Sequence, residues 1–456
     1  MIQKYRIGGK IVSAEDVDFP AVLVAAYAKK DRVFCECRKD VELQLYISHR
    51  FERHVLSRWP GSGSRHATAC DHYEAPDFLT GMGQVKGAAV QDNEVSGETV
   101  LKVDFPLTRG PARLAPSALT NDKASIKSTG QKLTMRGMLH FLWDRAQLTH
   151  WHPKMAGRRN WFVVRRALLD AAGACRLKME AMGDVMFIPE SFRIDDKGAI
   201  ASRRNSALER VRRSTNELMI VIGAVKEIEP AHGGSKIVLS QVGNAMPFTL
   251  DPDMTRRFNK RFEGELSLWR AGESSGAHLI IAGTFRRRVE GIIDLIEVSL
   301  MPVTKEWMPY ESIEESLLIA KAVRDNRRFV KGMRVNLDRT VQIASMVLKD
   351  TGDRATAVYL HDPKEEASEA LRHLMASEAV DHLCWCEGEA LAPRGGRGRP
   401  SAEPLAELAA GYLAAPEAGA VVMPDGEVVA VEVILVVEAS ADGSVKPGFE
   451  AYPDGA

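Results

Sequence analysis

Three cysteines and a histidine near the amino terminus have the residue types and the spacing of a metal site. Cys35 and Cys37 form a Cys-x-Cys pair, and His66 and Cys70 follow as His-x3-Cys. Thiolate sulfur and imidazole nitrogen are the ligands that Zn²⁺ prefers, and structural zinc takes four of them in a tetrahedron. The four residues therefore predict a structural zinc site, with His72 as an alternative to His66.

The segments around these residues are expected to bring them together. Residues 41–47 alternate apolar and polar side chains, which predicts a strand, and residues 54–59 read as its hairpin partner. Pro, Gly and Ser at 60–64 predict the turn that follows. The Cys-x-Cys pair then lies at the mouth of a hairpin and the His-x3-Cys pair returns just after it, as in zinc ribbons. The alternative is a strand in which only one of the two paired cysteines belongs to the core and no metal binds.

The composition is that of a globular chain without a charge bias. Of 456 residues 45% are hydrophobic, and Lys+Arg and Asp+Glu both number 61, so net charge indicates no partner. No run of 18 apolar residues and no apolar signal-peptide core is present, so we expect neither a membrane span nor export. Six cysteines in so long a chain, including Cys384 and Cys386, then indicate reduced thiols in the cytoplasm.

Charge is concentrated in a basic segment that we expect to be helical. Residues 135–148 have apolar residues at helical spacing, and Asn160 is a possible N-cap of a second helix over 160–172. Two helices joined by a short turn, the second rich in arginine, are compatible with a helix-turn-helix or winged-helix unit. Arginine binds phosphate and stacks on bases, and Trp151 and Trp161 are interleaved with the arginines. The candidate nucleic-acid-binding residues are Arg158, Arg159, Arg165, Arg166, Arg212 and Arg213. The alternative is a solvated helix face paired with acids such as Glu180 and Glu209.

The rest of the chain predicts a multidomain α+β protein. Strand periodicity at 218–222, 236–240, 278–283 and 294–300, with a helix over 253–269, favours a mostly antiparallel sheet, and a barrel used for single strands is possible. The expected segments are a zinc-ribbon-like unit at 1–80, a connector at 81–131, a helical basic unit at 132–215, a sheet domain at 216–310, a small α/β unit at 311–390, and a linker with a hairpin and tail at 391–456.

Several stretches resemble a known family. They include CECRK, ELQLYISHR and HVLSRWPGSGSRHATACDHYE, followed by LHFLWDRAQLTHWHP, WFVVRRALL and SLMPVTKEWMPYE. Over most of residues 5–390 the chain resembles an uncharacterised bacterial domain-of-unknown-function family carried on plasmids and integrative elements. The resemblance implies a mobile-element setting, which suits a nucleic-acid partner, and implies no particular activity.

The unit at 328–390 has a fainter similarity to restriction-endonuclease-like nucleases. A strand that ends in Asp350, a second strand, a helix and a closing strand follow in that order. The similarity implies an Asp and a Glu-x-Lys that hold Mg²⁺ and activate water. Asp350 or Asp353 could supply the Asp, but residues 358–361 contain neither Glu nor Lys. Asp425 and Glu432 imitate the pattern, also without the Lys.

Three functions remain as hypotheses. The first is a non-enzymatic, zinc-stabilised nucleic-acid-binding protein of a mobile element, with DNA as the expected partner. The second is a Mg²⁺-dependent nuclease that uses Asp350 at a degenerate site, and the third is a protein-interaction scaffold. No Walker, dinucleotide, Gly-x-Ser-x-Gly or His-Glu-x2-His pattern is present, so no small-molecule cofactor is expected. The sequence indicates no oligomeric state.

Overall fold

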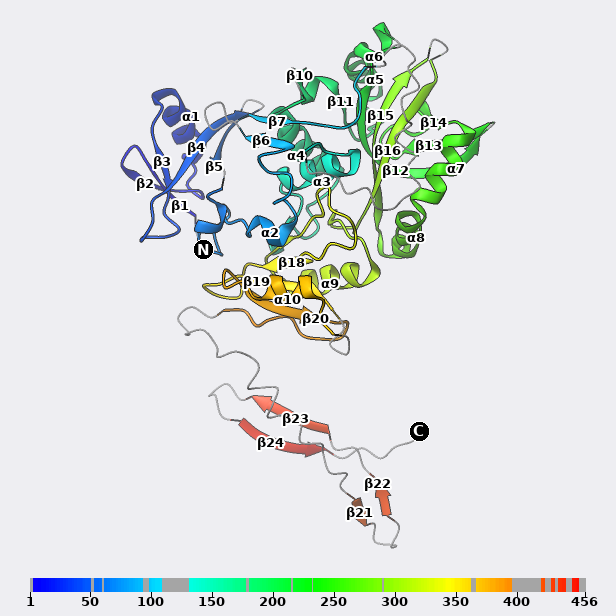
Figure 1. Ribbon diagram of the computed structural model, residues 1–456. Helices are drawn as coiled ribbons and strands as arrows, with labels where there is room; N and C mark the ends of the chain where they lie inside the picture. The colour runs from blue at the N-terminus through cyan, green and yellow to red at the C-terminus, as the bar shows by residue number, and fades with distance from the viewer. Residues whose placement is uncertain are drawn as a thin grey trace. The chain divides into compact units, whose positions relative to one another are not determined.

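The computed structural model describes most of the chain up to residue 395 and four strands beyond it (Figure 1). The chain divides into two compact units, Met1–Gly396 and Arg397–Ala456, and each is described by itself. The fold class is α+β, as the sequence predicts. The described residues are 3–50, 53–59, 61–92, 98–108, 131–177, 180–214, 216–231, 233–288, 291–361, 366–395, 420–422, 428–430, 434–439 and 445–450.

An antiparallel five-stranded sheet begins the first unit, in the order β2-β1-β3-β4-β5. The predicted hairpin is its β4–β5 pair, where Leu45 lies opposite Arg58. Leu43 and Leu45 are buried while Gln44 between them is exposed, so strand alternation sets the buried face. The elements are β1 Lys4–Ile7, β2 Lys10–Ser13, α1 Phe19–Lys29, β3 Val33–Cys35, β4 Leu43–Arg50 and β5 Arg53–Arg58.

The two predicted helices of the basic segment are present, but the prediction that a short turn joins them is wrong. The Thr134 and Asn160 side chains cap them by accepting hydrogen bonds from Gly137 N and Val163 N. Between the helices His150–Trp151 forms a strand, β8, because it pairs with a distant strand, β17. Other elements here are α2 Asp77–Thr80, β6 Val90–Asp92, β7 Thr99–Leu101, α3 Met135–Arg145, α4 Trp161–Gly173, β9 Cys175–Leu177 and β10 Glu180–Ala181.

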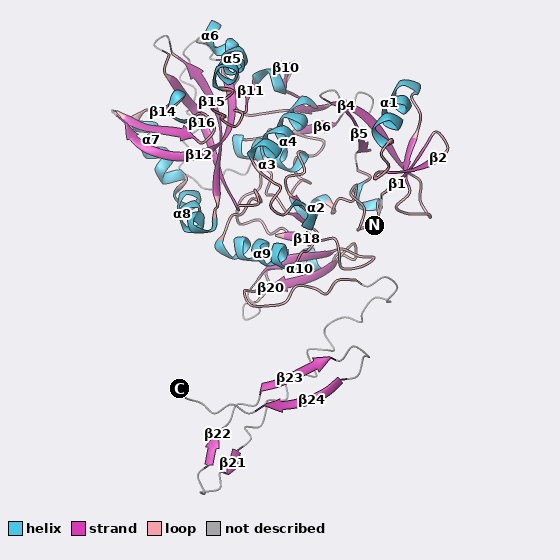
Figure 2. Cartoon of the chain, turned by 180° about the vertical axis from the view of Figure 1, so that it is seen from behind, coloured by secondary structure: helices cyan, strands magenta, loops and turns pink. Residues whose placement is uncertain are grey.

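The predicted antiparallel sheet closes into a small barrel, with α7 and α8 beside its strands (Figure 2). A register shift between Val225 and Glu227 lets the first half of β12 pair with β15 and the second half with β13. Strand order β15-β12-β13-β14 is a Greek key, and β16 closes the ring between β14 and β15. The predicted single helix over 253–269 is two helices. The elements are β11 Met186–Phe187, α5 Lys197–Ala207, α6 Glu209–Arg213, β12 Met219–Ala231, β13 Gly234–Leu239, β14 Phe248–Leu250, α7 Pro252–Arg261, α8 Glu263–Gly272, β15 His278–Arg287 and β16 Ile293–Val303.

A mixed sheet, β20-β19-β18-β17-β8, completes the first unit. One hydrophobic core combines Leu43 and Cys70 from the N-terminal sheet region with Val347 and Tyr359 from this sheet. The two sheets therefore depend on each other for burial of apolar surface. The elements are α9 Ile313–Arg324, β17 Phe329–Lys331, β18 Met346–Leu348, β19 Thr356–Leu360, α10 Glu369–Met375 and β20 Asp381–Trp385.

The second unit contains two antiparallel strand pairs. Ala420–Val422 (β21) pairs with Val428–Ala430 (β22), within the segment where the sequence predicts a hairpin. Ile434–Ala439 (β23) pairs with Val445–Glu450 (β24). The sequence also predicts an Ala-rich helix over 405–413, a segment that lies outside the described residues.

Candidate metal centre

The chain brings Cys35, Cys37, His66 and Cys70 together from three places. Cys35 is the last residue of β3, and Cys37 lies in the turn that follows. The β4–β5 hairpin then returns the chain, and a short 3-10 turn, Gly63–Arg65, places His66 beside the two cysteines. The sequence prediction of which four residues converge is confirmed, since they form a group that could hold a metal ion.

The distances between ligand atoms are close to the edges of a tetrahedral metal site. Cys35 Sγ lies 3.6 Å from Cys70 Sγ, and His66 Nδ1 lies 3.4 Å from Cys37 Sγ and 3.7 Å from Cys70 Sγ. All four atoms lie within 4.8 Å of one another. A tetrahedral metal with bonds of ~2.3 Å to sulfur has ligand–ligand edges of about 3.8 Å. The cluster therefore needs little rearrangement to enclose an ion.

Crowding and burial make the thiols unequal. The neighbouring Cys35 and Cys70 thiols lower the pKa of Cys37, whereas its thiol neighbours Cys37 and Cys70, together with burial, raise the pKa of Cys35. Cys35, Cys70 and His66 are buried, and Cys37 is half-buried. Three neighbouring thiolates in such a place repel one another unless a cation lies between them.

His66, and not the alternative His72, faces the sulfurs. His66 uses Nδ1 toward the cluster, and its buried Nε2 has no hydrogen-bond partner among the described side chains and backbone. The His72 ring contacts the Tyr5 hydroxyl at 3.2 Å, while its backbone N–H donates to Cys70 Sγ at 3.4 Å. His72 therefore stabilises the Cys70 sulfur through its backbone N–H, while its ring does not face the sulfurs.

The loop that carries the last two ligands is fastened to the mixed sheet. Lys349 Nζ donates to the Cys70 carbonyl at 3.0 Å, and the Thr68 hydroxyl donates to the Gly352 carbonyl at 2.7 Å. Arg328 donates to the Ala69 carbonyl at 3.1 Å. Sequence reasoning missed these anchors, because nothing local links residues that are 279 positions apart.

The candidate arginines have different surroundings. Arg159 donates to the carbonyls of Leu148 and His150 at 2.9 and 2.6 Å, and burial lowers its pKa to about 10. Arg165 Nε donates to the Ile188 carbonyl at 2.8 Å. Both guanidinium groups therefore stabilise the fold by donating hydrogen bonds to backbone carbonyls.

The other four candidates lie nearer to solvent. Arg212 and Arg213 pair with Glu209 at 3.8 and 2.9 Å. Arg158 is exposed and Arg166 half-buried, and neither side chain has a polar contact within the described parts of the chain. Trp151 and Trp161, the expected stacking residues, are buried, and the Trp161 indole donates to the Pro189 carbonyl at 2.7 Å.

Asp350, the catalytic candidate, lies in an ion pair. Its carboxylate accepts hydrogen bonds from Arg327 at 2.7–3.1 Å and from Arg328 N at 3.0 Å, and Arg327 is buried. The Asp350 contacts fasten the start of β17 to the end of β18. Asp425 and Glu432 lie outside the described residues.

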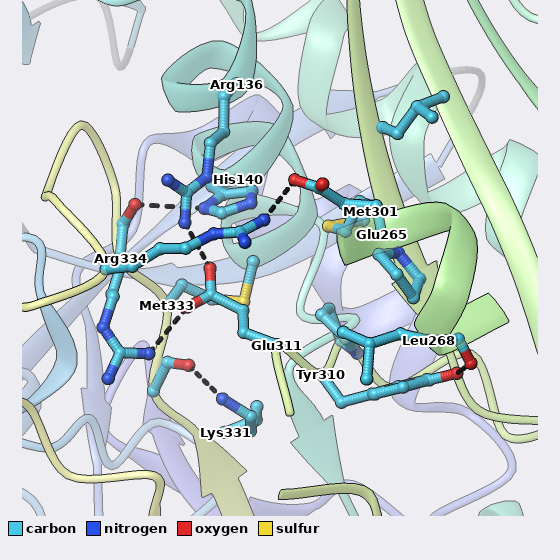
Figure 3. A pocket seen from close by; sticks show the side chains of 15 residues that line it. Arg136, His140, Glu265, Leu268, Met301, Tyr310, Glu311, Lys331, Met333 and Arg334 are labelled. Atoms are coloured by element: carbon cyan, nitrogen blue, oxygen red, sulfur yellow. Dashed lines mark hydrogen bonds and ion pairs between the residues drawn. The ribbon is translucent and has the colours of Figure 1, made fainter. Parts of the chain in front are cut away.

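A second polar site, lined by α3, α8 and the chain around β17, is an internal ion network (Figure 3). Glu311 pairs with Arg136 and with Arg334, the latter at 2.7 Å, and burial lowers the pKa of His140 to about 3 so that it stays neutral. The cavity volume is about 20 Å³. That volume suits a single water and is far below that of typical ligand pockets, so we assign the network a structural role.

Comparison with known proteins places the chain in a family. As a separate structural finding, no helix in the described part of the chain is long and apolar enough to cross a membrane. No curated protein and no solved structure matches the chain. A family described as Protein of unknown function (DUF1173) matches residues 5–388, which is most of its length, and the chain belongs to that family.

Proposed function

We propose that the cluster of Cys35, Cys37, His66 and Cys70 binds a structural zinc ion. The observation that carries this proposal is the convergence of one nitrogen and three sulfur atoms within 4.8 Å of one another. Four protein ligands would leave no open coordination position for a substrate or a reactive water. The ion would instead hold the loop at 66–70 against β3, at the junction of the N-terminal and mixed sheets.

Metal content tests the zinc proposal. We expect the purified full-length protein to contain one zinc per chain by mass spectrometry, and Cys70→Ser to lose it. Cys384→Ser, a half-buried cysteine outside the cluster, is the matched control and should keep the metal. Absence of zinc from the wild type, or equal zinc in Cys70→Ser, contradicts the proposal.

We further propose that this zinc-stabilised protein binds nucleic acid, as a component of a bacterial mobile element. The observation that carries it is the pair Arg158 and Arg166, which lie next to and on α4 and take part in no ion pair within the described chain. Guanidinium groups placed in this way suit phosphate contacts. The five-stranded Greek-key barrel adds support, because OB-fold proteins of that architecture bind oligonucleotides, although a fold by itself does not determine function.

A fluorescence anisotropy titration with labelled DNA at low and physiological salt tests nucleic-acid binding. We expect binding that weakens with salt and that weakens further in Arg158→Ala/Arg166→Ala. Lys10→Ala, which removes an exposed cation from β2, is the control and should bind as the wild type does. Absence of binding at low salt contradicts the proposal.

The nuclease and scaffold hypotheses receive no comparable support. A Mg²⁺ ion at Asp350 would have to displace Arg327, which is buried against the same carboxylate. Nothing in the described chain favours a scaffold over nucleic-acid binding. Incubation of the wild type with DNA and Mg²⁺ or Mn²⁺ tests the nuclease hypothesis, because cleavage would restore it.

A further inference from the structure

Two phenylalanines, one on α4 and one in the segment after β11, are exposed to solvent. Phe162 on α4 is 63% exposed, and Phe192 in the segment after β11 is 55% exposed. Ile194, close to Phe192 in the chain, is 77% exposed. Large apolar side chains that gather at a surface cost solvation free energy, and such a patch commonly marks a binding site.

Hydrogen bonds fix the segment of Phe192 beside the helix of Phe162. Trp161 Nε1 donates to the Pro189 carbonyl at 2.7 Å, and Arg165 Nε donates to the Ile188 carbonyl at 2.8 Å. Phe192 is three residues beyond Pro189, a span of at most ~11 Å of extended chain. The backbone of Phe192 therefore lies within reach of the start of α4, the helix that carries Phe162.

Arginines lie close to both phenylalanines in the chain. Arg166 is one turn after Phe162, so both point from the same side of α4. Arg158 precedes the helix, and Arg193 follows Phe192 with a side chain that is 72% exposed. We name this region the α4 surface, defined by Phe162, Phe192, Ile194, Arg158, Arg166 and Arg193.

The acids near the α4 surface pair with Arg193 and Arg203, so two arginines of the surface lie outside the ion pairs of the described chain. Arg193 pairs with Asp196 at 3.2 Å, and Glu190 pairs with Arg203 at 2.9 Å. Arg158 and Arg166 have no such partner in the described chain. Exposed rings beside unmatched guanidinium groups match a polyanion that carries flat apolar faces.

We propose that the α4 surface binds single-stranded nucleic acid, with Phe162 and Phe192 stacked on bases and the arginines on phosphates. This proposal rests on the nucleic-acid binding proposed above and specifies its substrate. A duplex keeps its bases stacked inside, so exposed rings gain contacts only from unpaired bases. Stacking on side chains tolerates any base, so we expect little sequence preference.

Anisotropy titrations of the full-length protein with a labelled oligonucleotide, single-stranded or annealed to its complement, test this inference. We expect the wild type to bind the single strand more tightly. Phe162→Ala and Phe192→Ala should each weaken single-strand binding about 5- to 100-fold and leave duplex binding unchanged. Phe162→Tyr should retain affinity while Phe162→Leu should not, because only tyrosine keeps a ring.

The control is Phe78→Ala, which removes an exposed phenylalanine from α2, where it is 47% exposed. This variant should bind as the wild type does. Equal binding of single strand and duplex, or single-strand binding that Phe162→Ala/Phe192→Ala leaves intact, overturns the inference while the proposed function stands. Failure to bind either form overturns both.

Discussion

The Cys/His cluster and the arginine-rich segment use chemically active side chains in opposite ways. In the cluster, four side chains from separate parts of the chain meet within 4.8 Å. Between Arg158 and Arg213, neighbouring arginines diverge: Arg159 is held by carbonyl oxygens in the interior, and Arg158 beside it is exposed. A metal site requires convergence, whereas a charged segment contains residues of unrelated roles.

This contrast makes the effects of substitution predictable. Each cluster residue shares one task with the other three, so losing any one of them should lose the whole site. Each arginine has its own surroundings, so its loss should have its own size and should show in its own measurement. The predictions that follow run from the largest expected effect to the smallest.

Removal of a metal ligand should have the largest effect. Cys70→Ser is expected to lower the free energy of unfolding by an amount on the order of 5 kcal/mol, because structural zinc contributes directly to folding. A chelator should lower the melting temperature of the wild type and leave that of Cys70→Ser unchanged. Thermal melts with and without chelator measure both effects. If chelator does not change the melting temperature of the wild type, no metal stabilises the cluster.

Arg159→Met should come next. The substitution leaves the carbonyls of Leu148 and His150 without their donor, and we expect a loss of about 3 kcal/mol in urea denaturation. The control is Arg158→Ala, which should change stability by less than about 0.5 kcal/mol because its side chain is exposed. If Arg159→Met loses as little stability as Arg158→Ala, the Arg159 hydrogen bonds do not stabilise the fold.

Asn160→Ala tests how α4 is positioned. Its side chain accepts a hydrogen bond from Val163 N at 3.2 Å, and loss of such a cap costs about 1 kcal/mol. Asn160→Asp should retain stability, since a carboxylate can cap the same position. If the alanine variant unfolds at the same urea concentration as the wild type, other contacts hold the start of α4.

Arg166→Ala should have the smallest effect on stability, below about 0.5 kcal/mol. Its expected effect is on the salt dependence of single-strand binding, whose logarithmic slope should fall by about 0.7 for each lost phosphate contact. Anisotropy titrations over a range of salt concentrations measure this slope. An unchanged slope would exclude Arg166 from phosphate contact and leave the α4 surface to its other cations.

Local signals explain which features the sequence could predict. The cluster was predictable because its ligands are rare residue types and the hairpin between them follows from alternation over 41–47 and 54–59. The cap at Asn160 is equally local. A barrel was one possibility in the sequence, but its closure could not be derived, because it depends on the parallel pairing of Phe248 with Ile293, far apart in the chain.

Two side chains at the start of α4 show a further limit of prediction from the sequence. Trp161 and Phe162 are adjacent apolar residues, and composition favoured the tryptophan as a stacking residue. The spacing of buried Trp161, Val164 and Leu168 instead places the tryptophan on the helix face toward the core and leaves Phe162 outside it. That periodicity was a usable signal for the exposed ring.

The anchoring of the Cys70 loop by Lys349 has a consequence for the order of folding during synthesis. The partner of the loop is 279 residues further along the chain, so at 5–20 residues per second it emerges from the ribosome roughly 15–55 s later. During that interval the N-terminal sheet lacks the residues that complete its core. All four cluster residues have by then been synthesised, so a metal captured early would keep the nascent segment folded until its partner arrives.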